Sequence, residues 1–418
     1  MATAAPAYNV KDSPSLLACG RLQGQAVQVD PASIAPRAGG RIYRATLNGP
    51  NAFPHLCGGV FGSVAIKVTE DDRTRKPRDP RREALMLADL DHPNILALLN
   101  AYMSEPSAIS PEPRIMLFTP YYPLTLRNLL DSPAFSPDIS QPDFEAVATS
   151  IACQLSHAIA HLHERGIAHR DLNPHNVVLS SAGRVVLIDF GISVETGQEK
   201  PGEMHFEVGT GAYRAPELIF ASRDYDPADL DLWALGCTLA DLYRPLALPV
   251  PPSPPSSEGS FERYYRECAT PEPEPKLSRR PLFDASSSDF VLAASIFRVL
   301  GTPTLETWPE ATRMPNFAHF TFASFPATPL GSHLPYLQTP SPTATILPQL
   351  LQISATKRVK ASAVVEAFRG SGEAILAPDD LSESERGLLD SSGGGAKMVD
   401  RLPDGRLLRE LLAAMVAA

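Results

Sequence analysis

The sequence is poor in cysteine, in positive charge and in long apolar runs. Its five cysteines among 418 residues are scattered and include no Cys-x-x-Cys pair, so neither structural zinc nor a disulfide framework is expected. The formal net charge of -10 argues against a protein that attracts nucleic acid over long distances. No apolar run approaches the roughly 20 residues that span a bilayer, and residues 1–10 lack the basic start and apolar core of a signal peptide. We therefore expect a protein of the cytoplasm or the nucleus, with no membrane and no nucleic acid among its partners.

Proline, in contrast, is in excess, with 42 residues, roughly double the average share. The stretch 245–276 is rich in proline, serine and glutamate, and this composition predicts an extended surface insert. Residues 379–397 are first acidic and then rich in serine and glycine. They precede an apolar stretch that predicts a last helix from Leu407 to Val416. The length of the chain suits two lobes better than one ordinary core.

Apolar and polar residues alternate between residues 16 and 68, as they do in strands joined by turns. We expect strands in this part at 25–29, 41–47 and 60–68, with a loop at 48–59. Asp79 followed by Pro80 predicts the start of a short helix, because these residues suit the N-cap and the first helical position. From Phe144 to Leu162, apolar residues recur every three to four positions, which predicts a long helix. The chain therefore changes from strand-rich to helix-rich near residue 120.

Three polar motifs follow one another in the middle of the chain: His169-Arg170-Asp171, Asn176 and Asp189-Phe190-Gly191. Phosphoryl transfer needs positioned phosphates, metal ions and an oriented hydroxyl group more than it needs covalent help. Asp171 can orient the hydroxyl group of a substrate or accept its proton, while Asn176 and Asp189 offer the hard oxygen ligands that Mg²⁺ prefers. This order and spacing indicate an enzyme that transfers a phosphoryl group from ATP.

Together with Ala215-Pro216-Glu217 further along, these motifs resemble those of the protein kinases, over roughly residues 20–370. Within that family the chain is similar to the cyclin-dependent and mitogen-activated group, because Leu300-Gly301-Thr302-Pro303-Thr304 resembles an insert of cyclin-dependent kinases. The resemblance implies an α+β, bilobal protein kinase fold and the use of ATP and Mg²⁺. The units it implies are an N-terminal extension at 1–19, a small β-rich N-lobe at about 20–119, a larger helical C-lobe at about 124–370, and a C-terminal tail with a terminal helix at 371–418.

The same resemblance assigns roles to individual residues. Lys67, in Val64-Ala65-Ile66-Lys67, matches the lysine that holds the ATP phosphates, and Glu83 matches the glutamate that pairs with this lysine. Thr210 matches the threonine that bridges to the catalytic aspartate of serine/threonine kinases. The implied sites are an ATP site of Gly39, Gly40, Ala65, Lys67, Glu83, Phe118, Tyr121 and Val178, metal ligands Asn176 and Asp189, and catalytic residues Lys67, Asp171, Asn173 and Thr210.

Two further matches are architectural rather than catalytic. Asp231 matches an aspartate of a buried helix that braces the catalytic loop. Arg358 matches a late arginine that pairs with the glutamate at position 217. If the resemblance holds, both contacts should be present in the fold.

The glycine-rich loop departs from the family pattern. Gly40-Arg41-Ile42-Tyr43-Arg44-Ala45 matches the end of the motif, but alanine and arginine replace its first two glycines. We expect backbone N–H groups near Gly39 and Gly40 to approach the phosphates. The run from Gly58 to Gly62 also mimics a glycine loop. It stays open as an alternative phosphate loop, although it lies very near the lysine strand.

Asn173 is a second departure, because serine/threonine kinases usually carry a lysine there that stabilises charge on the transferred phosphate. Asparagine removes the cation but can still donate hydrogen bonds. We expect a slower or differently tuned enzyme, and an inactive one stays an alternative.

The activation segment departs further. His205 stands where cyclin-dependent kinases carry their activating phosphothreonine, and no serine or threonine lies between residues 197 and 209. A phosphate at this site would pair with Arg170 and order the segment. The segment must therefore be ordered in another way, for which Glu203 or Glu207 offers a partial substitute.

The basic stretch 73–82 replaces the cyclin-gripping sequence of the family and predicts a solvated loop. Together with His205, it makes the chain similar to the monomeric fungal kinases that activate cyclin-dependent kinases. We therefore expect a serine/threonine kinase that works as a monomer without an obligate cyclin, in cell-cycle or transcription control. Its expected partners are protein substrates, with cyclin-dependent kinases as candidates. Two alternatives stay open: a pseudokinase scaffold, motivated by Asn173 and the weak glycine loop, and an ordinary cyclin-dependent kinase.

Overall fold

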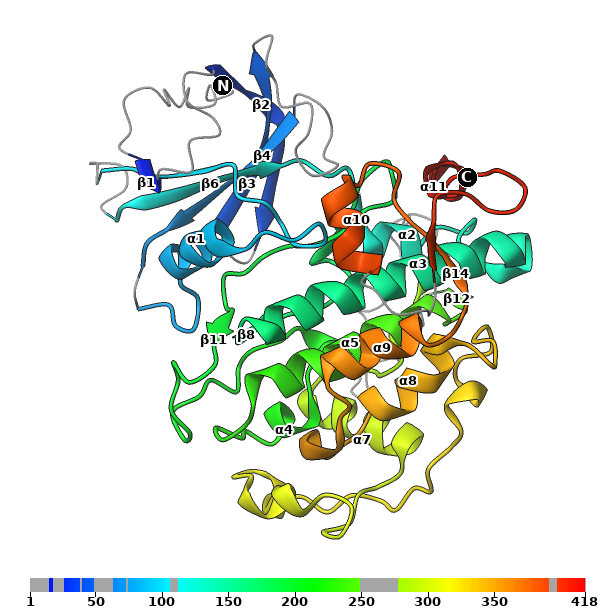
Figure 1. The fold of residues 1–418 in the computed structure, drawn as a ribbon. Coiled ribbons are helices and arrows are strands. Elements are labelled where there is room, and N and C mark those ends of the chain that lie inside the picture. Colours follow the sequence, from blue (N-terminus) through cyan, green and yellow to red (C-terminus); the bar gives the residue numbers. More distant parts are fainter. Residues whose placement is uncertain are drawn as a thin grey trace, which may run out of the picture.

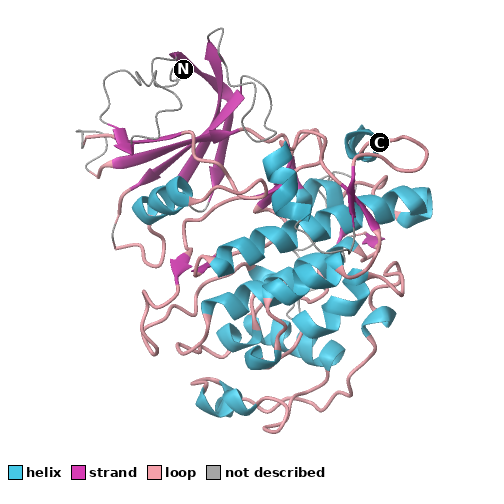
Figure 2. Ribbon diagram, viewed as in Figure 1, coloured by secondary structure: helices cyan, strands magenta, loops and turns pink. Residues whose placement is uncertain are grey.

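The computed structural model describes residues 15–17, 26–37, 40–48, 63–72, 74–105, 112–248, 277–390 and 397–417. Gly39, the run from Gly58 to Gly62 and most of the Pro-rich insert lie outside the described residues. The chain forms two lobes, with a twisted sheet and one helix above a larger helical body (Figures 1 and 2). This arrangement confirms the expected bilobal α+β fold.

The N-lobe contains a six-stranded sheet in the order β1-β5-β6-β4-β3-β2. Its strands are β1 (Ser15–Leu17), β2 (Ala26–Arg37), β3 (Gly40–Asn48), β4 (Ser63–Glu70), β5 (Asn100–Met103) and β6 (Arg114–Pro120). The three strands predicted in this region correspond to β2, β3 and β4, although β2 is longer than expected. The predicted start of the third strand, at 60–62, lies outside the described residues. Strands β3 and β4 pair antiparallel, as do β4 and β6.

Side chains on β4 alternate between the two faces of the sheet. Val64, Ile66 and Val68 are buried in a small core on one face. Ala65 and Lys67 consequently point to the other face, because successive residues of a strand point to opposite sides. This alternation places the lysine on the side of the sheet that faces the C-lobe.

Helix α1 (Pro80–Asp89) begins where the sequence predicts. The Asp79 side chain accepts a hydrogen bond from the Arg82 N–H at 3.0 Å, which satisfies one of the donors at the start of the helix. Pro80 occupies the first turn, where its missing N–H has no cost. The helix buries Glu83 against the sheet, with 2% of that residue exposed.

The C-lobe is built around two long helices, α3 (Pro137–Glu164) and α5 (Pro227–Leu242). Helix α3 contains the predicted helical stretch 144–162. The other helices of the lobe are α2 (Leu126–Leu130), α4 (Pro216–Ile219), α7 (Asp289–Leu300), α8 (Pro342–Leu350) and α9 (Ala361–Arg369). Its short strands are β7 (Leu124–Thr125), β8 (Ile167–Ala168), β9 (Val177–Leu179), β10 (Val185–Leu187), β11 (Val194–Glu195), β12 (Leu246–Ala247) and β13 (Ser278–Arg279). Across the described ranges, no helix is both long and apolar enough to cross a membrane.

The last part of the chain, residues 374–417, is here called the C-terminal segment. It contains β14 (Ala374–Leu376), α10 (Glu383–Asp390), β15 (Lys397–Val399) and α11 (Leu408–Ala417). Strands β14 and β15 pair in parallel, and α11 corresponds to the predicted last helix. Leu376, Leu389, Met398 and Leu411 are buried in the main C-lobe core. The segment therefore adds to that core.

The predicted pair between Glu217 and Arg358 is confirmed. Two hydrogen bonds of 2.7 and 2.8 Å join the Arg358 guanidinium to the two carboxylate oxygens of Glu217. Both residues are at least 97% buried, with 2% and 3% exposure, and the guanidinium lies 5.2 Å from the ring centroid of Trp233. The pair joins the end of the activation segment to the loop before α9.

Removal of one member of this pair should destabilise the fold strongly. Arg358→Met leaves the Glu217 carboxylate buried without its cation, which costs about 3–5 kcal/mol of unfolding free energy. Arg165→Met is the matched control, because the side chains of Arg165 and its partner Asp89 are 40% and 79% exposed, and such pairs contribute about 0–1 kcal/mol. Urea unfolding of both variants measures the difference. Equal losses of unfolding free energy in the two variants would contradict the prediction, because burial would then not increase the contribution of the Arg358 pair.

Candidate active site

A cavity of about 320 Å³ lies between the two lobes. Gly40, Ile42 and Ala65 line it from the N-lobe sheet, and Val178 and Ile188 line it from the C-lobe. Its apolar walls suit an apolar ring, since most ligand pockets combine apolar walls with a few polar groups. The predicted apolar residues Ala65 and Val178 thus lie in one cavity, contributed by opposite lobes.

Phe118, which the resemblance places in the ATP site, does not line this cavity, so its predicted place there is wrong. In the pairing of β4 with β6, Phe118 lies opposite Ile66, whereas Thr119 lies opposite Ala65. Paired residues of antiparallel strands point to the same face. Phe118 is therefore buried in the core on the far side of the sheet, and Leu117 and Thr119 line the cavity in its place.

Tyr121 lines the cavity at the connection between the lobes. Its backbone N–H donates to the Ser63 carbonyl at 3.4 Å, and the Arg44 guanidinium lies 4.7 Å from its ring centroid. Pro120, the residue before it, has no N–H to donate. Tyr121 therefore lies in the cavity, where the resemblance places it, with its backbone N–H engaged with β4.

The turn between β2 and β3 reaches the cavity through Gly40. This residue has φ +137, and a Cβ atom there would lie 2.3 Å from the Val68 carbonyl oxygen, so only glycine fits. Ile42 pairs with Lys67 across β3 and β4, which places the start of β3 beside the lysine. Gly40 is thus the one residue of the two candidate phosphate loops that lies within the described residues, and it lines the cavity.

Lys67, Glu83 and Asp189 meet at the inner end of the cavity. The Lys67 ammonium lies 2.7 and 2.9 Å from the two Glu83 oxygens and 2.7 Å from Asp189 Oδ1. Burial would raise the pKa of Asp189, but Lys67 and Arg78 outweigh it and hold that pKa well below its usual range. Burial raises the pKa of Glu83 despite Lys67. The Lys67 ammonium group thus connects Glu83 of α1 to Asp189, the carboxylate expected to hold a metal.

The catalytic loop is held from beneath by Asp231. Its carboxylate accepts hydrogen bonds from the backbone N–H groups of His169, at 2.8 Å, and Arg170, at 2.7 Å. Arg170 has φ 65, a left-handed conformation that is costly for a non-glycine residue and persists only where the surroundings impose it. The predicted bracing role of Asp231 is therefore confirmed, and it sets the direction in which Asp171 leaves the loop.

Three side chains converge on the Asp171 carboxylate. Thr210 donates from Oγ1 at 2.6 Å, Asn176 from Nδ2 at 2.9 Å and Asn173 from Nδ2 at 3.3 Å. Burial raises the pKa of Asp171, and the hydrogen bond from Thr210 works against that rise. The structure brings together four of the predicted site residues here: Thr210 and Asn173 donate to Oδ1 of Asp171, and Asn176 donates to its Oδ2.

Asn173 is 2% exposed and holds both ends of its amide in the loop. Its Nδ2 donates to the Asp171 carbonyl at 3.0 Å, and its Oδ1 accepts from the His175 N–H at 3.0 Å. The side chain is therefore a positioning donor for Asp171. It does not supply the cation that a lysine would bring to a phosphate.

Asn176 and Asp189 both line the cavity. The Ile188 N–H donates to the Asn176 carbonyl at 2.9 Å, which couples the two segments next to these side chains. Because Asn176 Nδ2 donates to Asp171, its amide oxygen is the atom suited to a cation. A carboxylate and an amide oxygen are hard donors of the kind that Mg²⁺ takes together with phosphate oxygens, so the predicted pair fits this metal.

Two functional contacts were not predicted. Arg78 Nη1 lies 3.4 Å from Asp189 Oδ1, so the basic stretch before α1 is not simply a solvated loop. Arg170 pairs with Glu199, at 2.7 and 3.1 Å between guanidinium nitrogens and carboxylate oxygens, and the predicted substitutes Glu203 and Glu207 are both exposed. Glu199 belongs to the same acidic segment, but spacing alone does not reveal which carboxylate folds back.

The hydroxyl group of Thr210 should matter for turnover more than for nucleotide binding. Thr210→Val removes the hydrogen bond to the Asp171 carboxylate, and hydrogen bonds to charged groups contribute about 1.5–3 kcal/mol. We expect kcat for phosphoryl transfer to fall about tenfold or more, with little change in KM for ATP. Thr210→Ser keeps the hydroxyl group and should stay near wild type. If the Thr210→Val and Thr210→Ser variants have the same kcat, the hydrogen bond to Asp171 does not contribute to catalysis.

Comparison with known proteins agrees with this geometry. The family model described as "Protein kinase domain" matches residues 62–367. The serine/threonine-protein kinase csk1 of Schizosaccharomyces pombe is 28% identical over 308 residues, which cover 72% of this chain and 84% of that protein. Cyclin-dependent kinase 7 of Xenopus laevis is 29% identical over 304 residues, covering 73% and 71%.

Cyclin-dependent kinase 20 of Danio rerio is 30% identical over 212 residues, 51% of each chain. Among solved structures, the yeast RNA polymerase II CTD kinase CTDK-1 complex contains a chain with a TM-score of 0.54 and 21% identity, covering 78% of this chain and 89% of that one. At this identity the structural likeness concerns the fold alone. The chain belongs to the protein kinase family, and it is a serine/threonine protein kinase related to the cyclin-dependent kinases.

Proposed function

We propose that this kinase phosphorylates and thereby activates cyclin-dependent kinases, in cell-cycle or transcription control, and that it does so as a single chain. It needs neither a cyclin nor a phosphate on its own activation segment. The proposal is supported by the absence of serine and threonine between residues 197 and 209 and by the internal contacts that take the place of both activators.

The proposal gives each site residue a role with Mg·ATP. Ala65 and Val178 would hold adenine in the cavity that they line, and Lys67 would bind the phosphates. Asn176 and Asp189 would hold the metal, which would neutralise charge on the phosphates. Asp171 orients the hydroxyl group of the substrate and accepts its proton. These steps rely on positioning and charge, as phosphoryl transfer generally does.

The observation that carries the proposal is the ion pair between Arg170 and Glu199. The Arg170 side chain is fully buried, and that of Glu199 is 16% exposed. The Arg170 Nε also donates to the Ile192 carbonyl at 2.8 Å. A buried guanidinium needs a compensating anion, which in many kinases is a phosphate on the activation segment. In this chain a carboxylate occupies that place next to Asp171.

Helix α1 is also anchored within the chain. Its N-cap residue, Asp79, donates its backbone N–H to the Gly191 carbonyl at 2.9 Å, and Arg78 from the same turn reaches Asp189. At the other side of the helix, Glu83 already pairs with Lys67. These three contacts support the proposal that α1 brings the glutamate to the lysine without a partner subunit.

A reconstituted phosphorylation assay tests the proposal. The purified chain, treated with phosphatase and then mixed with Mg·ATP but no cyclin, should phosphorylate an inactive cyclin-dependent kinase on its activation-segment threonine, as detected by mass spectrometry. Glu199→Gln removes the charge opposite Arg170 and should lower the rate about tenfold or more. Glu203→Gln makes the same charge change at an exposed position of the same segment, so it should stay within about twofold.

The outcomes separate the parts of the proposal. Phosphorylation of a generic peptide without phosphorylation of any cyclin-dependent kinase would overturn the proposed substrate class and leave the kinase activity standing. Activity only after a cyclin is added would indicate an ordinary cyclin-dependent kinase. No transfer to any substrate, with ATP binding intact, would indicate the pseudokinase scaffold.

A further inference from the structure

The C-terminal segment packs against the turn between β9 and β10, the two strands that precede Asp189 in the chain. Gly183, in the turn between β9 and β10, has φ +90, and a Cβ atom there would lie 2.5 Å from Leu408 of α11. The Ser150 hydroxyl group of α3 donates to the Leu376 carbonyl of β14 at 2.6 Å. Both ends of the segment therefore touch the part of the C-lobe that holds β10.

Arg184, the residue just before β10, is the centre of this contact. It is 1% exposed. Its guanidinium lies 3.2 Å from Asp380 Oδ1, 2.7 Å from the Asp380 carbonyl and 2.6 Å from Glu385 Oε1. Both of these partners come from the C-terminal segment. A buried cation requires such partners, so the conformation of the chain around Arg184 depends on the segment being in place.

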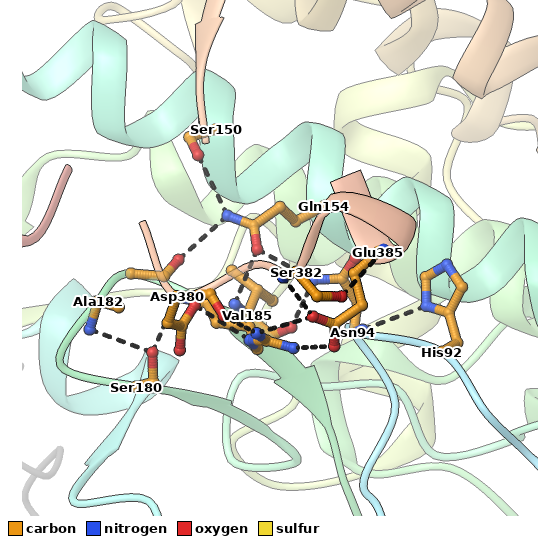
Figure 3. Close-up of polar contacts among 12 residues, drawn as sticks. His92, Asn94, Ser150, Gln154, Ser180, Ala182, Val185, Asp380, Ser382 and Glu385 are labelled. Atoms are coloured by element: carbon orange, nitrogen blue, oxygen red, sulfur yellow. Dashed lines mark hydrogen bonds and ion pairs between the residues drawn. The ribbon is translucent and has the colours of Figure 1, made fainter. Parts of the chain in front are cut away.

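A chain of buried hydrogen bonds joins this contact to the loop after α1 (Figure 3). The Gln154 side chain donates to Ser150 Oγ and to the Gly183 carbonyl, both at 3.1 Å, and it accepts from the Val185 N–H at 2.9 Å. The Asn94 side chain donates to Gln154 at 3.0 Å and to the Val185 carbonyl at 2.8 Å. The first residue of β10 is thus held by one side chain from α3 and one from the loop.

Strand β10 is connected in two directions, to helix α1 and to Asp189. The Leu187 N–H donates to the Asn94 carbonyl at 2.9 Å, and the Leu96 N–H donates to the Leu187 carbonyl at 3.0 Å. The loop at 92–96 follows α1, which carries Glu83. In the other direction, β10 ends two residues before Asp189. A shift of β10 would therefore move the metal carboxylate and the base of α1 together.

We propose that the C-terminal segment is an intramolecular activator of the kinase: Asp380 and Glu385 hold Arg184 and, through β10 and the Asn94 loop, position Asp189 and α1 for binding of Mg·ATP. Glu385 and Arg184 are positioning residues in this account, because neither contacts the nucleotide. The inference rests on the kinase activity of the chain and is independent of which protein it phosphorylates.

The test uses the full chain, a generic serine/threonine peptide and four variants. Glu385→Gln weakens the contact with Arg184 and should raise KM for Mg·ATP about tenfold. It should also speed amide hydrogen exchange at Leu187 and Leu96 by about tenfold. Glu385→Asp keeps the carboxylate and should restore most of the wild-type KM. Glu383→Gln changes the same charge at an exposed position of α10, so it should stay within about twofold of wild type in both measurements.

The fourth variant guards against simple unfolding. Arg184→Gln combined with Asp380→Asn and Glu385→Gln removes the cation and both of its carboxylates, so no unpaired charge of this contact stays buried. This triple variant should still show the raised KM and the faster exchange. If the single and triple variants melt at lower temperature while KM and exchange at Leu96 and Leu187 stay at wild-type values, the segment only stabilises the fold and the proposal fails. Equal effects of Glu383→Gln and Glu385→Gln would also overturn it.

Discussion

The arrangement of the active site depends on one buried ammonium group, that of Lys67. It lies within 2.9 Å of oxygens on both Glu83 and Asp189, which come from a helix of the N-lobe and a loop of the C-lobe. Two carboxylates cannot stay charged together in a water-poor cleft without a cation between them. Because Lys67 sits on the central part of the sheet, this requirement sets the position of α1 and of the Asp189 loop at the same time.

The same requirement recurs at two other buried cations, Arg170 and Arg184. Each is matched by carboxylates of its own chain, Glu199 for the first and Asp380 with Glu385 for the second. Many kinases bring an external charge or subunit to order these regions, whereas here the compensating groups are already part of the sequence. Buried ion pairs are weak evidence of stability, but they restrict geometry strongly, because a displaced partner leaves an uncompensated charge. These ion pairs within the chain thereby fix the elements that form the cleft.

Much of the site could be predicted because its chemistry lies in short strings. Asp171, Asn176 and Asp189 keep a spacing that follows from phosphoryl transfer itself. The structure places Asn176 and Asp189 in one cavity and joins Asn176 to Asp171 by a hydrogen bond. The resemblance wrongly places Phe118 in the ATP site, because a match of short strings does not fix the register between β4 and β6, and that register decides which side chains face the cleft. Glu199 could not be identified because the acidic residues of its segment are alike in sequence. Only the fold of that segment selects one of them.

The most direct test of the account is whether the isolated chain, treated with phosphatase and free of any cyclin, transfers the γ-phosphate of ATP to a serine/threonine peptide. The account predicts transfer by the wild type and a rate about 10²–10⁴ times lower for Asp171→Asn, with ATP binding retained in both proteins. Equal and minimal transfer by the two proteins, despite normal ATP binding, would contradict it, because the cleft would then be assembled without being catalytic.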